Sequence, residues 1–287
     1  MDYFVNIEKT DYELWQAELL IESFNYNNCS EKLLCVISEN KKDICYPIPL
    51  KNVFDHKRGI ISRNVGEERG YKPLNALYNL FWMQNSNLLK QPFALLSPDM
   101  VLRKDINFNF NDPNFSEIVF APYPELTFNA AVDAVGPFWE YCKNDQKYYQ
   151  ENWIPFGCFA LFNCIPLNFF YRTIFIAESL AVKQLIDKKE IWKHTDKLAW
   201  TINMADSIGQ LFLKGDYQIV DAMFNNSESS IIHYEHGLPP NFNKTEYMYQ
   251  PPAFMSKGNP FEVIAQNPAT ANAHFMSNLA KKIQSKE

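Results

Sequence analysis

The sequence predicts an α/β fold in which a mostly parallel central sheet is flanked by helices. Two observations carry this prediction. Strand-like and helix-like segments alternate along the first third of the chain, and the second strand-like segment is almost continuously apolar, as strands buried on both faces are. The length of 287 residues and the apolar content of 47% are sufficient for one large domain. We expect residues 1–255 to form that domain, and residues 256–287 to form a tail whose short helix packs on the domain or extends from it.

The N-terminal elements follow from their hydrophobic patterns. Tyr3–Glu8 has the pattern of a short strand, and the helix that follows has apolar side chains on one face and Asp11 as its candidate N-cap. Lys32–Ser38 is an apolar run of strand length, and Asn75–Leu89 has the pattern of an amphipathic helix. Phe93–Leu96 is the next strand. This order is typical of parallel strands joined by crossover helices.

The middle and C-terminal segments are less regular. The predicted elements are strands at Ile118–Phe120 and Phe156–Ile165, and helices at Phe138–Gln150, Phe169–Ile186, Leu198–Leu213 and Ala271–Ile283. Several prolines precede the last helix, which indicates an extended segment that wraps the domain.

Composition excludes several classes of protein. The net charge of −6 and the pI of about 5.5 argue against the strongly basic surface that duplex-DNA binders carry. The six cysteines form no Cys-x-x-Cys pair, which favours reduced thiols. No signal peptide or membrane-spanning stretch is recognisable. We therefore expect a soluble protein without a membrane partner. We expect it in the cytoplasm, or in a host cytoplasm if the Asn- and Lys-rich composition reflects a phage or viral genome.

The turn after the strand Phe93–Leu96 is a candidate metal site. Ligands of open parallel sheets bind beyond the carboxyl ends of the strands. Ser97 and Asp99 lie at such an end, where a carboxylate can hold Mn²⁺ or Mg²⁺ against a diphosphate. The other interpretation is an aspartate that caps a turn. Ile7 and Glu8 end the first predicted strand, and we expect them, with Trp15, to frame a nucleotide.

The segment Ile231–Pro240 offers two histidines. His233 and His236 lie on either side of Glu235, just after two β-branched residues. A histidine at the end of a strand can be the second ligand of a divalent ion or a donor to phosphate oxygens. We assign His233 to the metal and His236 to the nucleotide. The alternative is a pair of histidines with ordinary hydrogen bonds.

A polar, glycine-bearing segment precedes the helix Asn75–Leu89. Its cations Arg63, Arg69 and Lys72 are candidates for contact with a diphosphate near a helix N-terminus. The segment lacks the spacing of a P-loop. A solvated loop of mixed charge is the alternative.

Two acidic residues near the predicted helix Leu198–Leu213 are candidates for acceptor chemistry. Asp196 or Asp206 would orient a hydroxyl group or accept its proton. Most acids on helices are solvated surface groups, which is the alternative for each. No nucleophile elbow, kinase loop or His-Glu-x-x-His motif occurs, so hydrolase and kinase functions have no support.

The order of these segments resembles a known family. The residues that carry the likeness are Trp15-Gln16, Gly70-Tyr71-Lys72-Pro73-Leu74-Asn75-Ala76, Ser97-Pro98-Asp99, Pro155-Phe156-Gly157, Asp196-Lys197-Leu198-Ala199-Trp200 with Met204, and His233. Over roughly residues 3 to 255 they resemble the plant and algal hydroxyproline O-arabinosyltransferases and the related peptidyl serine galactosyltransferases.

The resemblance implies a GT-A-like (Rossmann-like) domain, a UDP-sugar donor and a divalent metal, Mn²⁺ or Mg²⁺. The metal motif of the family reads approximately Glu-Pro-Asp-His, so that only Asp99 carries over as a ligand. Asn203 replaces the acid in the family pattern Trp-x-x-Glu-Met. An amide can position a sugar but cannot act as a base. The plant proteins are anchored in membranes, which indicates a different acceptor here.

Three functions follow from these residues. The first is metal-dependent transfer of a hexose or pentose from a UDP-sugar to a hydroxyl group on a peptide or glycan. The second is glycosylation of hydroxymethylated pyrimidines in phage DNA, in which a small basic patch would reach a flipped base. The third is a catalytically degenerate protein that binds a nucleotide sugar without turnover.

Overall fold

The computed structural model describes residues 1–39, 51–110, 112, 114–187, 189–221, 228–235, 237, 242–244, 259–266 and 268–286. These residues divide into two compact units. The first unit consists of Met1–Phe4, Arg63–Leu96 and Asn109–Tyr217, and the second of Val5–Ser62, Ser97–Phe108 and Gln218–Glu287. Each unit is therefore assembled from segments that lie far apart in the sequence.

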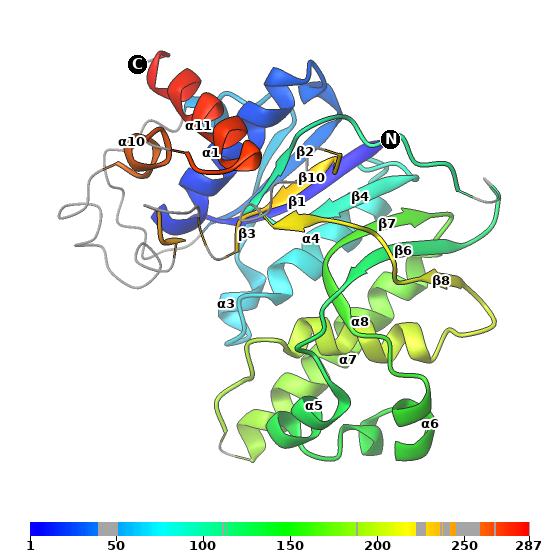
Figure 1. The fold of residues 1–287 in the computed structure, drawn as a ribbon. Helices are drawn as coiled ribbons and strands as arrows, with labels where there is room; N and C mark the ends of the chain where they lie inside the picture. The colour runs from blue at the N-terminus through cyan, green and yellow to red at the C-terminus, as the bar shows by residue number, and fades with distance from the viewer. Residues whose placement is uncertain are drawn as a thin grey trace. The chain divides into compact units, whose positions relative to one another are not determined.

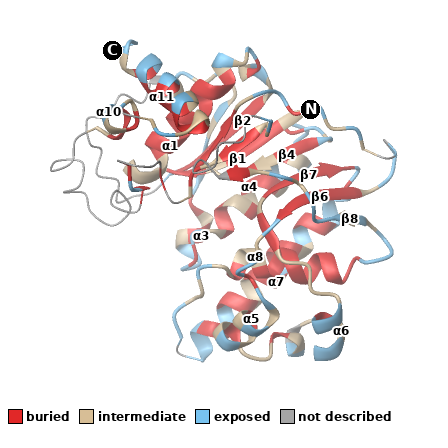
Figure 2. Cartoon of the chain, in the orientation of Figure 1, coloured by how far each residue is buried: buried red, intermediate tan, exposed pale blue. Residues whose placement is uncertain are grey.

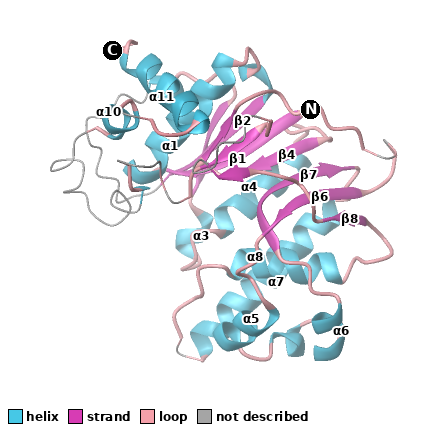
Figure 3. Cartoon of the chain, viewed as in Figure 1, coloured by secondary structure: helices cyan, strands magenta, loops and turns pink. Residues whose placement is uncertain are grey.

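The strands form one large and one small sheet (Figure 3). The large sheet has the order β3-β2-β1-β4-β7-β6-β8, in which the strands are β1 (Asp2–Glu8), β2 (Leu33–Glu39), β3 (Gly59–Arg63), β4 (Phe93–Leu96), β6 (Glu117–Pro122), β7 (Phe156–Asn163) and β8 (Phe212–Lys214). β7 runs antiparallel to β4 and β6, and β8 runs parallel to β6. The small sheet has the order β5-β10-β9, with β5 (Met100–Leu102), β9 (Val220–Asp221) and β10 (Ile231–His233). The predicted α/β fold with a mostly parallel sheet is confirmed.

The first unit contains most of the helices (Figure 1). They are α3 (Val65–Glu68), α4 (Leu74–Asn85), α5 (Phe128–Val135), α6 (Gln146–Glu151), α7 (Leu167–Ile186) and α8 (Thr195–Ala205), with a 3-10 turn, η2, at Phe138–Tyr141. α7 is the central helix and packs against both α4 and α8. Its buried side chains include Phe169, Phe170 and Leu180.

The second unit has its own hydrophobic core. Its helices are α1 (Asp11–Tyr26), α2 (Lys51–Phe54), α10 (Pro260–Ile264) and α11 (Ala271–Gln284), with a 3-10 turn, η1, at Ser30–Lys32. α11 packs on α1 and α10, and the core between them includes Trp15, Ile232, Tyr234, Phe261 and Met276. Figure 2 shows the buried inner faces of these helices. The C-terminal helix is thus part of this unit's core.

Helix boundaries differ from the sequence prediction where a local side chain or backbone conformation intervenes. α1 is capped by the hydroxyl of Thr10, which accepts from the Glu13 amide, rather than by Asp11. Asp11 becomes the first helical residue, where its charge suits the helix dipole. α4 ends at Asn85 because Asn87 adopts a positive φ of 56°.

Two of the predicted helices are wrong in extent. The stretch Phe138–Gln150 divides into η2 and α6 because Asp145 caps a new helix by accepting from the Tyr148 amide. The second, Leu198–Leu213, ends at Ala205, and Gly209 follows with a φ of 83°. The chain then enters β8, which the sequence pattern does not reveal.

The structure also bears on the state of the cysteines and on the apolarity of the helices. The cysteines that the structure describes, Cys29, Cys35, Cys142, Cys158 and Cys164, are all free thiols. Among the described helices, none combines the length and the apolarity that a bilayer crossing requires.

Candidate functional site

Backbone pairing in the small sheet of the second unit brings Asp99 beside the end of β10. Asp99 directly precedes β5, which pairs with β10 in antiparallel register so that His233 lies opposite Met100. The amide of Tyr234 then donates to the carbonyl of Asp99 at 3.1 Å. A turn closed by the Met100 amide on the Ser97 carbonyl at 3.2 Å leads into the strand. Two segments far apart in the sequence therefore meet at one strand end, and the predicted metal ligation by Asp99 and His233 stays a prediction.

The Asp99 carboxylate is held by a lysine ammonium and a histidine imidazole. Its Oδ2 atom lies 3.2 Å from Nε2 of His233 and 2.5 Å from Nζ of Lys244. The three side chains are 13%, 12% and 5% exposed, in the order Asp99, His233, Lys244. The other carboxylate oxygen, Oδ1, is buried and has no hydrogen-bond partner among the described residues. We call these three residues the Asp99 cluster.

The charges of the Asp99 cluster stabilise one another. Burial alone raises the pKa of Asp99, but the charges of His233 and Lys244 outweigh it and hold that pKa well below its usual value. Burial lowers the pKa of His233, and the charge of Asp99 outweighs burial so that the net shift is upward. The cluster therefore carries one carboxylate beside an ammonium and an imidazole that readily takes a proton.

A half-buried glutamate interacts electrostatically with the cluster. Oε2 of Glu13 accepts from the amide of Glu8, the last residue of β1, at 2.7 Å. Burial, reinforced by the charge of Glu8 and more weakly by that of Asp99, raises the pKa of Glu13 to about 8. Glu13 is therefore mostly protonated at neutral pH and adds little negative charge. Ile7 precedes Glu8 in β1 and is fully buried.

Aromatic rings complete the surroundings. Nζ of Lys244 lies 5.8 Å from the ring centroid of Tyr12 and 5.5 Å from that of Tyr234. Trp15 is fully buried and packs on Tyr234 and Phe242, with centroid distances of 6.1 Å and 5.6 Å. Trp15 thus supports the cluster from the core, and its predicted contact with a nucleotide stays a prediction.

The residues present do not fit a divalent ion. The described part of the chain contains no group of three His, Cys, Asp or Glu side chains placed to hold a metal. Oδ2 of Asp99 is already paired with the Lys244 ammonium, which has no lone pair with which to ligate an ion. A metal ion at Asp99 would also be opposed by that full positive charge. In the structure, the Lys244 ammonium occupies the position beside Oδ2 of Asp99.

The three predicted diphosphate cations belong to the first unit and are exposed. Arg63 forms a two-point ion pair with Glu68, at 2.9 Å and 2.7 Å. Arg69 lies 3.5 Å from Glu178. Lys72 is exposed on the turn before α4. Their contact with a ligand stays a prediction. His236, which we assigned to the nucleotide, lies outside the described residues, and Ser97 contributes its carbonyl to the turn before β5.

Asp196 lies in the first turn of α8 in the first unit and pairs with a buried tyrosine. The hydroxyl of Tyr71 donates to Oδ1 of Asp196 at 2.8 Å, and the Asp196 amide donates to that hydroxyl at 3.1 Å. Burial raises the pKa of Asp196, and the charge of Lys197 opposes the rise. The Asp196 carboxylate is also hydrogen-bonded to the backbone at Lys197, which lowers its pKa.

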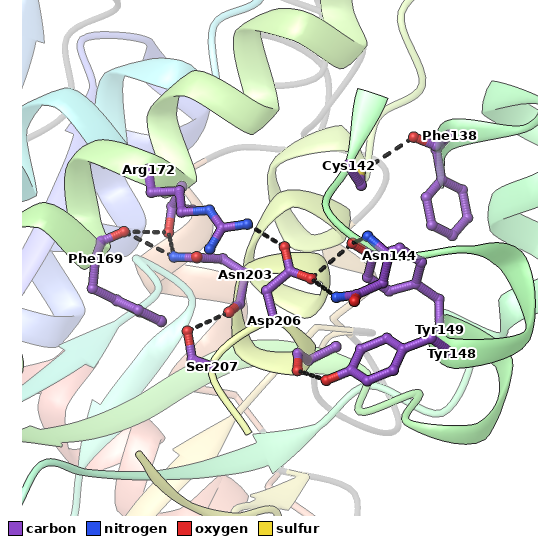
Figure 4. Close-up of polar contacts among 12 residues, drawn as sticks. Phe138, Cys142, Asn144, Tyr148, Tyr149, Phe169, Arg172, Asn203, Asp206 and Ser207 are labelled. Carbon is purple, nitrogen blue, oxygen red and sulfur yellow. Dashed lines mark hydrogen bonds and ion pairs between the residues drawn. The ribbon is translucent and has the colours of Figure 1, made fainter. Parts of the chain in front are cut away.

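Asp206 lies at the end of α8 in a buried polar network (Figure 4). Figure 4 shows Arg172, Asn144 and Tyr149 converging on its carboxylate. Asn144 Nδ2 donates to Oδ1 at 2.7 Å, Tyr149 donates to the same oxygen at 2.8 Å, and Arg172 is ion-paired with Oδ2. Both oxygens are thus engaged. The network joins α6, α7 and α8.

Asn203 is fully buried on α8. Its Nδ2 donates to the carbonyl of Phe169 at 2.8 Å and to the hydroxyl of Thr173 at 2.9 Å, both on α7. These bonds fasten α8 to α7. Its predicted contact with a sugar is not tested by them and stays a prediction.

Sequence reasoning missed Lys244 and Glu13. Lys244 lies in a polar, proline-rich segment without a periodic pattern. Glu13 looks like an ordinary first-turn acid, because its burial depends on segments that come later in the sequence. The one available signal is the grouping of Asp99 and His233 at two predicted strand ends, since a carboxylate buried there needs a cation.

The fold is similar to those of solved glycosyltransferases. The galactosyltransferase LgtC in complex with donor and acceptor sugar analogs matches with a TM-score of 0.51 and 10% identity, over 98% of this chain and 96% of that one. An active-site mutant of LgtC matches over the same shares with a TM-score of 0.48 and 10% identity. No protein-family model and no curated protein sequence matches the chain.

A larger enzyme also appears in this comparison. The apo structure of the bifunctional glycosyltransferase WbbM matches with a TM-score of 0.44 and 12% identity, over 82% of this chain. The chain spans 45% of the length of that protein. At these identities the likeness concerns the fold alone. The chain has a GT-A-like α/β fold.

Proposed function

We propose that the chain transfers a sugar from a nucleoside-diphosphate sugar to a hydroxyl acceptor. The expected donor is a UDP-sugar. The observation that carries the proposal is the Asp99 cluster, in which a buried ammonium and an imidazole lie against one carboxylate at a strand end of a GT-A-like fold. Strand ends of open α/β sheets are where such folds bind their ligands.

The reaction requires positive charge at the leaving group. The bond between the anomeric carbon and the diphosphate oxygen breaks, and its electron pair leaves with the diphosphate. A bond forms between that carbon and the acceptor oxygen, whose proton passes to a base or to water. Negative charge therefore grows on the diphosphate, and fixed cationic donors in a poorly hydrated site stabilise it. Lys244 and His233 are donors of this kind.

Asp196 and Asp206 are the candidates for the group that orients the acceptor hydroxyl. Burial raises the pKa of Asp196. Three donors engage the carboxylate of Asp206. The acceptor itself, whether a peptide, a glycan or a hydroxymethylated DNA base, is a question for experiment.

Release of UDP from a panel of UDP-sugars tests the proposal. We expect turnover by the wild-type chain and a loss of about 100-fold in Asp99→Asn, which leaves Lys244 without its carboxylate. Asp105→Asn is the matched control, since Asp105 forms an exposed ion pair with Lys32 in the same unit and should be without effect. Thermal unfolding checks that each variant is folded.

Absence of turnover with every donor, or equal rates in Asp99→Asn and the wild type, would refute the proposal. Separate reactions with labelled donor and a hydroxyproline peptide, a glycan or hydroxymethylated DNA would identify the acceptor. Binding of UDP without turnover would instead indicate a nucleotide-sugar-binding protein that has lost catalysis. The amide at Asn203, where the resembling family has an acid, favours this second candidate.

A further inference from the structure

Lys244 is a buried ammonium in a site built to hold it. Its side chain is only 5% exposed, which is uncommon for lysine because an unpaired ammonium is costly to bury. Asp99 supplies the opposite charge, and the rings of Tyr12 and Tyr234 lie within 6 Å of Nζ. Carboxylate and aromatic faces together stabilise a cation at a fixed place.

The Asp99 cluster retains unused hydrogen-bonding capacity. An ammonium has three N–H donors, and Asp99 is its sole hydrogen-bond acceptor among the described residues. Within the described part of the chain, its other two donors have no hydrogen-bond acceptor. Oδ1 of Asp99 and the hydroxyl of Tyr234 are also buried without a hydrogen-bond partner in the described part of the chain. Buried polar groups of this kind are normally satisfied, so that their grouping fits a polar ligand that accepts from Lys244 and carries donors of its own.

We propose that Lys244 is the resident cation of the donor site and takes the place of the divalent metal that the sequence resemblance implies. The inference rests on the proposed function. The Lys244 ammonium donates to the diphosphate of the donor and stabilises the charge that grows there as the bond to the sugar breaks. Asp99 positions the ammonium, and His233 provides a second donor. Donor binding is consequently independent of divalent ions.

Calorimetric titration with UDP tests this inference. The wild-type chain is titrated once in EDTA and once in Mn²⁺, and we expect dissociation constants that agree within about twofold. In EDTA, Lys244→Met should bind UDP at least about 10-fold more weakly, since a charge-assisted hydrogen bond is lost. Lys244→Arg keeps the charge and should retain binding in EDTA. Lys32→Met removes an exposed lysine of the same unit and should behave as the wild type.

The outcomes separate this inference from the proposed function. Binding of UDP by the wild type in Mn²⁺ but not in EDTA overturns the role of Lys244 and leaves sugar transfer intact. Equal affinities of Lys244→Met and Lys32→Met in EDTA also overturn it. Binding in neither condition overturns both proposals. If Lys244→Met does not fold, Lys244→Gln takes its place in the same comparison with Lys32→Met.

Discussion

Two buried aspartates, Asp206 and Asp99, differ in how their carboxylate oxygens are hydrogen-bonded. Asp206 has donors on both oxygens and links three helices of the first unit. Asp99 has an ammonium and an imidazole on one oxygen and none of the described donors on the other. A fully satisfied carboxylate is typical of a structural network, whereas a partly satisfied one is typical of a ligand site. Residue type and burial alone do not distinguish the two.

The structural role of Asp206 leads to a prediction about stability. Asp206→Ala leaves Arg172 without its counter-ion and two further donors without an acceptor, so we expect the free energy of unfolding to fall by about 3 kcal/mol. Asp216→Ala removes an exposed pair with Lys214 and should cost less than about 1 kcal/mol. Urea unfolding measures both. Unchanged stability of Asp206→Ala combined with lost turnover would assign the residue to the acceptor instead.

Single residues determine the packing or the ends of individual elements. Gly157 in β7 is one, because a Cβ at this position would lie 2.1 Å from the carbonyl oxygen of Ala121, next to the register shift in β6. The glycine of the segment Pro155-Phe156-Gly157 therefore has a packing explanation. α2 is another, since its first amides, those of Asn52 and Val53, donate to the two carboxylate oxygens of Glu18 on α1.

The link between α1 and α2 should depend on pH. Burial raises the pKa of Glu18 from 4.5 to about 7, against the lowering effect of hydrogen bonds from the Asn52 and Val53 amides. Lys286 also lowers that pKa and Glu22 raises it. Between these two values the folded state binds more protons than the unfolded chain, so that the free energy of unfolding falls as pH rises. The contribution is fully present below pH 4.5 and is lost above about pH 7.

Glu18→Gln removes this titration. Urea unfolding at pH 5 and pH 8, values that bracket the shifted pKa, should show a smaller loss of stability in the variant than in the wild type. An identical pH dependence of the two proteins would contradict the assignment of the effect to Glu18.

At the scale of the whole molecule, periodic patterns determined what the sequence could predict. The strands Phe93–Leu96 and Phe156–Asn163 and the helix α11 have strong local patterns and were predicted closely. α5 and β8 were missed because they are short and lack an uninterrupted pattern. The α/β class was predictable because it depends on the order of elements rather than on their boundaries.

The candidate site was predictable only where a strand ends. Asp99 and His233 follow or end predicted strands, and they lie 3.2 Å apart. Lys244 was not predictable, because no periodic pattern around it in the sequence places it at Asp99. The sequence therefore indicated a carboxylate that needs a cation and, through the family resemblance, suggested a metal, whereas the structure provides a lysine.

The central claim is that a nucleoside diphosphate binds at the Asp99 cluster. A crystal structure of the complex with UDP tests this claim most directly. We predict diphosphate oxygens within about 3 Å of Nζ of Lys244, the distance of a charge-assisted hydrogen bond, in crystals grown with EDTA. A UDP molecule bound elsewhere on the chain, with Lys244 still sealed against Asp99, would contradict the account.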